Sequence, residues 1–363
     1  MSQLDHVAVG IKVIGLLDSA SYSTTYKMAT LLGLIDVIQE SVALDGTFPA
    51  TLSGSAIADK VFERYWKQSI PYTGVNAGIP EFLKQSPQRD IPQIIAEYRK
   101  NSGNFSRSST IASVEANDPE GMKSLRQDAR RRILRMPIPR LQKLGGKDDW
   151  KEDRFLFDYN WEEDKLPTDD SLYLKDGIAE SLMKVRPLLR PYIETLWATF
   201  VADRNPTLTD SSRLRDALFG ASRTNTAPLR EPLRAIQNGC CFFCGKPLTT
   251  GGDVDHFFAF THFANEDLDN FVLSCSPCNG SKAAILPTLT HLSSLLKRNA
   301  SSTALDKLST DLDWPRGTER VNSLASLAYL VETSTLLWKA PGQFEPLDHT
   351  AAQQILQQTT IKK

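Results

Sequence analysis

Apolar side chains recur every three or four positions along the first hundred residues, which is the spacing of helices with one buried face. This pattern predicts helices over 24–41 and 55–68, separated by breaks at Gly46 and Pro49. Short helices on short loops fit either a helix-turn-helix or winged-helix unit that reads DNA, or a helical bundle that binds no nucleic acid. The aromatic face of the second helix favours a buried core over a surface that stacks on bases.

A polar, serine-rich stretch at 101–113 is interpreted as a linker. Beyond it, Asp118 and Pro119 predict a helix start, because aspartate caps helices and proline suits the first turn, and Pro137 predicts the end of this helix. Farther along, apolar spacing predicts a helix over 171–203 that two internal prolines kink or divide. Shorter helices are predicted at 210–219, 229–238, 289–298, 303–312 and 321–337.

The segment 123–147 is strongly basic, with nine lysines and arginines against one aspartate. In a chain whose 42 basic and 43 acidic residues give a net charge of −1, this segment is the best candidate for a surface that follows phosphates. Alternatively, it is a solvated helix face or the partner of the acidic segment 148–164. The candidate nucleic-acid contacts are Arg130, Arg131 and Arg135.

The composition is that of an ordinary globular protein, with 41% hydrophobic and 23% charged residues. The sequence has no apolar run long enough to cross a membrane and no signal-peptide pattern at its start. We expect a mainly α protein with a small α+β module. Its parts would be a helical N-terminal domain (1–105), a connector with the basic helix and acidic segment (106–205), and a C-terminal domain (206–363) with its core at 229–287 and helices after it.

All five cysteines lie in one stretch of the C-terminal part, and a chain of this size does not need disulfides, so we expect a metal site in a reducing cytoplasm. Four of them form two C-x-x-C pairs, Cys241 with Cys244 and Cys275 with Cys278, separated by 30 residues. Two such turns supply the closed tetrahedral shell of sulfurs that structural zinc prefers. The extra thiol, Cys240, either replaces Cys241 as a ligand or packs as a small apolar side chain.

The segment between the cysteine pairs has the pattern of a strand, a loop and a second strand, and a helix follows. Apolar and polar side chains alternate over 254–258, and 271–273 is a short apolar run. This order of elements would bring Asp255, His256 and Asn279 together. A neutral histidine serves as a base near pH 7, and carboxylate and amide oxygens suit Mg²⁺ or Mn²⁺. Hydrolysis of a phosphodiester needs such a base and such a cation.

Three short motifs carry a resemblance to a known family: Val-Asp255-His256-Phe, Asp-Asn270-Phe-Val-Leu and Cys278-Asn279-x-x-Lys282. The stretch 229–287, about one sixth of the chain, resembles the HNH endonucleases with a ββα-metal fold and paired zinc knuckles. The last motif position holds asparagine, as in the HNN variant of that family. One departure is Ala259, which stands where many relatives have a proline.

The resemblance implies roles for five residues. His256 would be the general base, and Asn270 would order the loop that holds it. Asp255 and Asn279 would coordinate the catalytic Mg²⁺ or Mn²⁺, and Lys282 would contact a phosphate.

The same resemblance implies a metal-dependent endonuclease that hydrolyses DNA, nicking one strand at each site. The flanking helices loosely resemble those of bacterial HNH proteins from restriction and anti-phage systems. They imply a cytoplasmic defence protein whose partners are DNA and other subunits of such a system. Two alternatives stay open: a zinc-stabilised DNA-binding module without catalysis, and an effector that cleaves RNA. His262 faces the cleft or lies in a loop, and the sequence leaves the oligomeric state open.

Overall fold

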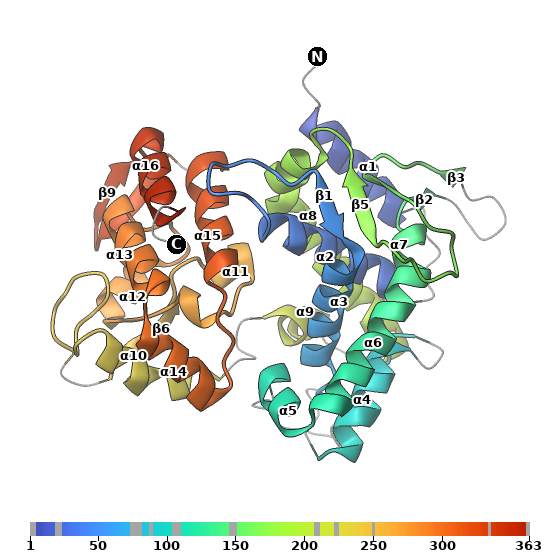
Figure 1. Ribbon diagram of the computed structural model, residues 1–363, viewed down its shortest axis with the longest axis horizontal. Helices are drawn as coiled ribbons and strands as arrows, with labels where there is room; N and C mark the ends of the chain where they lie inside the picture. Colours follow the sequence, from blue (N-terminus) through green and yellow to red (C-terminus); the bar gives the residue numbers. More distant parts are fainter. Residues whose placement is uncertain are drawn as a thin grey trace. The chain divides into compact units, whose positions relative to one another are not determined.

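The computed structural model is mainly helical, with small antiparallel sheets (Figure 1). The residues that it describes are 5–18, 24–72, 82–86, 90–103, 110–144, 151–206, 211–220, 225–248, 251–332 and 335–360. Contacts within the chain define two compact units: unit 1 is Met1–Ile38 with Phe48–Arg223, and unit 2 is Gln39–Thr47 with Thr224–Lys363. Apart from the segment 39–47, the segments 1–105 and 106–205 lie together in unit 1.

Unit 1 is a helical assembly with two small sheets. Its helices are α1 (His6–Asp18), α2 (Tyr26–Gln39), α3 (Gly54–Gln68), α4 (Ile91–Asn101), α5 (Ile111–Asn117), α6 (Pro119–Arg135), α7 (Pro137–Arg140), α8 (Ile178–Arg204) and α9 (Ser211–Phe219). One sheet has the order β1 (Thr51–Ser53), β5 (Ser171–Leu174), β4 (Phe157–Tyr159), and the other pairs β2 (Lys143–Leu144) with β3 (Lys151–Glu152).

The predicted helices over 24–41 and 55–68 are confirmed as α2 and α3. Helix α3 begins after Ser53, whose side-chain oxygen accepts a hydrogen bond from the backbone N–H of Ala56. Its aromatic face is core, as its pattern indicates, because Tyr65 and Trp66 expose only 0% and 3% of their surface. This face therefore offers no platform for bases.

Helix α6 starts where the sequence predicts it to start. The Asp118 carboxylate accepts a hydrogen bond of 2.9 Å from the Gly121 N–H, and Pro119 is the first helical residue. At the other end, the chain leaves α6 and Pro137 begins the short α7. Local capping chemistry thus sets both ends of this helix.

The linker predicted at 101–113 is only partly a linker. Helix α5 already begins at Ile111, after a cap in which the Thr110 side chain accepts a hydrogen bond from Ser113 N–H. The segment 104–109 lies outside the described residues.

The helix predicted over 171–203 begins later than expected. Its first residues instead form β5, which has hydrogen-bonded neighbours on both sides, β1 and β4. From Ile178 onward, α8 is one helix that contains both Pro187 and Pro191, so the prolines do not divide it. Its buried side chains include Ile193 and Trp197, and tertiary packing of this face offsets the helix hydrogen bonds that the prolines remove.

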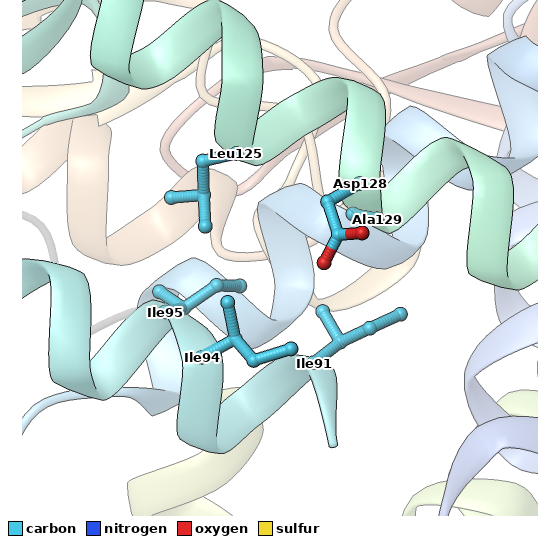
Figure 2. A pocket seen from close by; sticks show the side chains of 6 residues that line it. All are labelled: Ile91, Ile94, Ile95, Leu125, Asp128 and Ala129. Atoms are coloured by element: carbon cyan, nitrogen blue, oxygen red, sulfur yellow. The ribbon is translucent and has the colours of Figure 1, made fainter. Parts of the chain in front are cut away.

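A narrow crevice lies between α4 and α6 (Figure 2). Figure 2 shows isoleucine side chains of α4 facing Leu125 of α6, with Asp128 at the edge. The crevice has no room for a water molecule. It is therefore a packing seam between two helices rather than a binding site. Its lining residues are Ile91, Ile94, Ile95, Leu125, Asp128 and Ala129.

Unit 2 contains the cysteine region and the C-terminal helices. Its helical elements are η2 (Ala227–Leu229), α10 (Arg230–Ile236), α11 (Phe260–Phe263), η3 (Leu268–Asn270), α12 (Ser276–Lys282), α13 (Leu289–Ala300), α14 (Thr303–Leu312), α15 (Thr318–Ser326), η4 (Leu327–Val331) and α16 (His349–Thr360). Two hairpins pair β6 (Asp253–His256) with β7 (Phe271–Ser274), and β8 (Leu336–Ala340) with β9 (Gln343–Pro346).

The helices predicted at 289–298 and 303–312 are confirmed as α13 and α14, but the one at 321–337 ends early. Leu336 and Leu337 belong to β8, because their backbones pair with Pro346 and Glu345 of β9. Among the helices of the described residues, none combines the length and apolar character that crossing a bilayer requires.

Candidate functional site

Four cysteine sulfurs gather at one point of unit 2. The Sγ atoms of Cys241, Cys244, Cys275 and Cys278 all lie within 4.8 Å of one another, and those of Cys244 and Cys275 are 3.8 Å apart. Four sulfurs at about 2.3 Å from a central zinc ion would stand about 3.8 Å from each other in a tetrahedron. The cysteines form no disulfide. The cluster that the C-x-x-C spacing predicts is present, and its geometry fits zinc.

Backbone hydrogen bonds build the first turn of this cluster and join it to the second. Gly245 has φ +68°, a conformation that favours glycine, and its N–H donates to Cys241 O at 3.0 Å. The Phe242 N–H donates to Leu273 O of β7 at 2.9 Å. The Cys275 N–H donates to Cys241 Sγ at 3.3 Å. The thiol cluster is thus tied directly to one strand of the β6–β7 hairpin.

Cys240 lies outside the cluster, since its Sγ instead donates to Asn238 O at 3.5 Å. Of the two interpretations of this residue, the one in which it replaces Cys241 as ligand is wrong. Inside the cluster, burial and the neighbouring thiols raise the pKa of the Cys278 thiol. A divalent cation among the sulfurs favours thiolates, so metal binding would release protons there.

The β6–β7 hairpin places His256 opposite Phe271 in an antiparallel pair. Their ring centroids are 4.4 Å apart, and the ring centroid of Phe260 lies 5.5 Å from that of the imidazole. Strand β6 ends at His256, two residues before the end of the alternating pattern at 254–258. The imidazole is therefore half-buried between aromatic rings at the point where the chain leaves the strand.

Asn270 fastens the loop that follows His256. Its side-chain oxygen accepts a hydrogen bond from Phe258 N–H at 2.8 Å, and its amide nitrogen donates to Phe258 O and Asn265 O, both at 3.1 Å. Its own carbonyl accepts a bond of 2.7 Å from Phe257 N–H. Because Asn270 is completely buried, these bonds are shielded from water. This is the contact pattern expected of a residue that orders the loop.

Asp255 and Lys282 form a buried ion pair. Lys282 Nζ lies 3.1 Å from Asp255 Oδ2, and the two side chains expose 0% and 15% of their surface, lysine first. Burial raises the pKa of the Asp255 carboxyl, although the Lys282 ammonium opposes this shift. Lys282 Nζ also donates to Ala283 O at 3.0 Å. The phosphate contact that the sequence predicts for Lys282 would require this side chain to leave its buried position.

Asn279 lies half-buried on α12, three residues before Lys282, and α12 packs against β6. The same short helix carries Cys278, so it connects the thiol cluster with the strand of Asp255. The coordination of Mg²⁺ or Mn²⁺ by Asp255 and Asn279 stays a prediction. Their oxygens suit such a cation, which keeps several waters in sites of this kind. His262 is exposed at the end of α11.

Sequence reasoning missed a group of charged residues around the turn η3, which leads into β7. Asp267 immediately precedes the turn η3 and Asp269 lies within it, and both are buried. Arg320 forms a two-pronged ion pair with Asp267, and Arg316 does the same with Asp269. The repeated aspartates before Asn270 were the only available sign, because nothing local links them to arginines 47 and 53 residues downstream.

In unit 1, the basic side chains of α6 largely contact carboxylates and carbonyls of the same unit. Arg130 binds both oxygens of Asp59 at 2.7 and 2.6 Å, and Arg135 Nε donates to Asp164 O at 2.8 Å. Arg131 is 56% exposed and only 3.9 Å from Asp128. Beyond the helix, Arg140 and Lys143 form ion pairs with Glu163 of the acidic segment. These contacts support pairing of the basic segment with acidic neighbours. Contact with DNA through Arg130, Arg131 and Arg135 stays a prediction.

Comparisons of the chain with protein-family models, curated proteins and solved structures found no match. A function must therefore be inferred from the side chains that unit 2 brings together.

We expect Lys282→Met to destabilise unit 2 by about 3 kcal/mol, because it leaves the Asp255 carboxylate buried without its counter-charge. Chemical denaturation of the full chain, followed by hydrogen exchange in unit 2, measures this loss. Lys297→Met, at an exposed position on α13, is the control and should change stability by less than about 0.5 kcal/mol. Equal stability of the two variants would contradict the ion pair.

Proposed function

We propose that this protein is a metal-dependent endonuclease of the HNH type that hydrolyses phosphodiester bonds of DNA. The observation that carries this proposal is the hairpin beside the thiol cluster. It holds His256 between aromatic rings, with Asp255 next to it and Asn270 fastening the following loop. A structural zinc site, a half-buried histidine and a buried carboxylate on one small hairpin are the parts that such a nuclease requires.

In this proposal each residue has a distinct role. His256 takes a proton from the attacking water, which requires the neutral imidazole. Asp255 and Asn279 would hold a Mg²⁺ or Mn²⁺ ion, which supplies charge neutralisation for the phosphate and the departing oxygen. Asn270 keeps the His256 loop in place through its bonds to Phe258 and Asn265. The four thiolates and their zinc would hold the first turn against β7.

A plasmid assay tests the proposal. Full-length protein is incubated with supercoiled plasmid in Mg²⁺, in Mn²⁺ and in excess chelator. Because one site of this kind cuts one strand, open-circular DNA should accumulate before linear DNA in either metal, and chelator should prevent both. Direct conversion to linear DNA would contradict nicking by a single site.

The same assay separates the two alternatives that the sequence leaves open. A DNA-binding module without catalysis would shift the plasmid on a gel and cut it in no divalent metal. An effector that acts on RNA would cleave a structured RNA, incubated in parallel, and leave the plasmid intact. Either result would overturn the proposal of a DNA nuclease.

We expect charge reversal on α6 to test whether this helix binds phosphates. If it does, Arg131→Glu combined with Arg135→Glu should weaken DNA binding and lower the salt slope by about one unit for each phosphate that the helix no longer neutralises. Arg130 is left unchanged because its ion pair with Asp59 holds α6 against α3. Lys165→Glu, at another exposed position of unit 1, is the control. An unchanged slope in the double variant would assign α6 to a solvated surface.

A further inference from the structure

The turn that carries Asn270 is fixed by charged residues that lie outside the motif. Asp269, the residue before it, is completely buried, and its two carboxylate oxygens accept four hydrogen bonds. Arg316 donates two of them, at 2.7 and 2.9 Å, and the Gly317 N–H and the Thr318 hydroxyl donate the others, each at 2.8 Å. Although burial alone would raise the pKa of Asp269, these donors lower it overall, so the carboxylate is charged and fully occupied.

Arg298, near the end of α13, holds the backbone on both sides of Asn270. Its guanidinium donates to Asp269 O at 2.8 Å and to Phe271 O at 2.7 Å. The Asn299 side-chain amide donates to the same Asp269 carbonyl at 2.9 Å. The carbonyls that flank Asn270 are therefore anchored to one helix by a charged donor and a neutral one.

This anchored turn leads directly to the candidate base. The ring centroid of Phe271 lies 4.4 Å from that of His256 and 5.6 Å from that of Trp314. Asn270 bonds the backbone of the two residues that follow His256, Phe257 and Phe258. A displacement of the turn would therefore move both the ring against which the imidazole packs and the loop that leaves it.

We propose that Arg298 and the Asp269–Arg316 ion pair are positioning groups of the active site, which fix the turn of Asn270 and Phe271 against His256. This inference rests on the proposed nuclease function. Under it, the working unit of the enzyme extends beyond 229–287, the stretch that resembles the family, to include the end of α13 and the start of α15. None of these three charged groups touches the substrate.

Amide hydrogen exchange in the full-length, zinc-loaded protein tests the proposal without requiring activity. The reporters are the amides of Phe257 and Phe258, which donate to Asn270 at 2.7 and 2.8 Å. Arg298→Met should speed their exchange by about tenfold or more, because the substitution removes the charged donor from the turn. The zinc content should stay unchanged. Arg298→Lys keeps the charge but not the forked geometry of the guanidinium, so its two reporter amides should exchange at a rate between those of Arg298→Met and the wild type.

The matched control is Asp306→Ala. Asp306 is 69% exposed and pairs with Arg316 on the side away from Asp269, so its removal should leave both reporter amides unchanged. The positioning role would be overturned if the Phe257 and Phe258 amides of Arg298→Met exchanged at the wild-type rate. It would also be overturned if hydrogen exchange accelerated equally throughout unit 2. If Arg298→Met does not fold, the same readout is taken from Arg298→Lys, and wild-type exchange there has the same meaning.

Kinetics then connect the turn with catalysis. In Arg298→Lys, kcat for plasmid nicking should fall several-fold while KM for DNA stays the same, because the substrate does not contact this residue. A rise in KM alone would contradict positioning and indicate a DNA contact. Should the wild-type protein fail to nick DNA, the proposed function fails, yet the exchange experiment still decides whether Arg298 orders the loop.

Discussion

Replacing His256 by alanine should abolish most plasmid nicking, with a loss of about 10²- to 10⁴-fold, since a positioned general base contributes a factor of this size. The imidazole is the only histidine ring on strands β6 and β7, and it packs against Phe271. The measurement is the initial rate of open-circle formation in Mg²⁺ at saturating DNA. Zinc content and DNA affinity should stay close to those of the wild type, because His256 is not among the four residues of the thiol cluster.

His262→Ala is the matched control for this experiment. His262 lies six residues farther along the same loop region, and its side chain is exposed on α11. Its removal should change the rate less than about threefold. A nicking rate in His256→Ala equal to that of the control would refute the assignment of His256 as the base and would require another residue to activate water.

Loss of the zinc site should have the largest effect on structure. The thiol cluster joins the first turn to β7, and a structural zinc ion contributes on the order of 10 kcal/mol of folding free energy in small zinc-binding peptides. We therefore expect Cys278→Ser to lose bound zinc, to unfold the hairpin region of unit 2 and to lose nicking. Metal analysis after dialysis and hydrogen exchange over 240–283 measure these outcomes.

Cys240→Ser provides a close control, because Cys240 is next to a ligand in sequence but outside the cluster. This variant should keep one zinc ion for each chain, and its amide hydrogens should exchange at the wild-type rates. Prolonged treatment of the wild type with a strong chelator should reproduce the effect of Cys278→Ser. Retention of zinc by Cys278→Ser, or loss of zinc by Cys240→Ser, would show that the ligand set is wrong.

Several features of the fold were readable from local chemistry. The ends of α6 follow from Asp118 and Pro137, and the extent of α3 follows from the apolar spacing over 55–68. Such features are predictable because a helix end is decided by side chains within one turn of it. The helix predictions failed for Ser171–Leu174, which form β5, and for Leu336 and Leu337, which belong to β8. Strand β5 pairs with β1, which lies far away in the sequence, whereas β8 pairs with β9 just two residues farther on. Apolar periodicity alone reveals neither pairing.

The candidate site, like the fold, was predictable from the sequence only in part. The cysteine spacing indicated a four-sulfur cluster, and the structure brings Cys241, Cys244, Cys275 and Cys278 together. The sequence also singled out Asn270, whose bonds to the loop after His256 have the expected pattern. For Lys282, the family resemblance implied a phosphate contact, whereas the structure buries this side chain against a carboxylate.

The sequence by itself singled out the candidate residues, because each cysteine pair and each of the three short motifs is a contiguous stretch with its own internal spacing. Tertiary structure alone decided how those residues are supported. Arg298 and Arg316 reach the turn of Asn270 from segments that follow the motif, and Lys282 turns inward to Asp255. The physical reason is that ion pairing and burial act through space, so residues far apart in the chain meet only when unit 2 has folded.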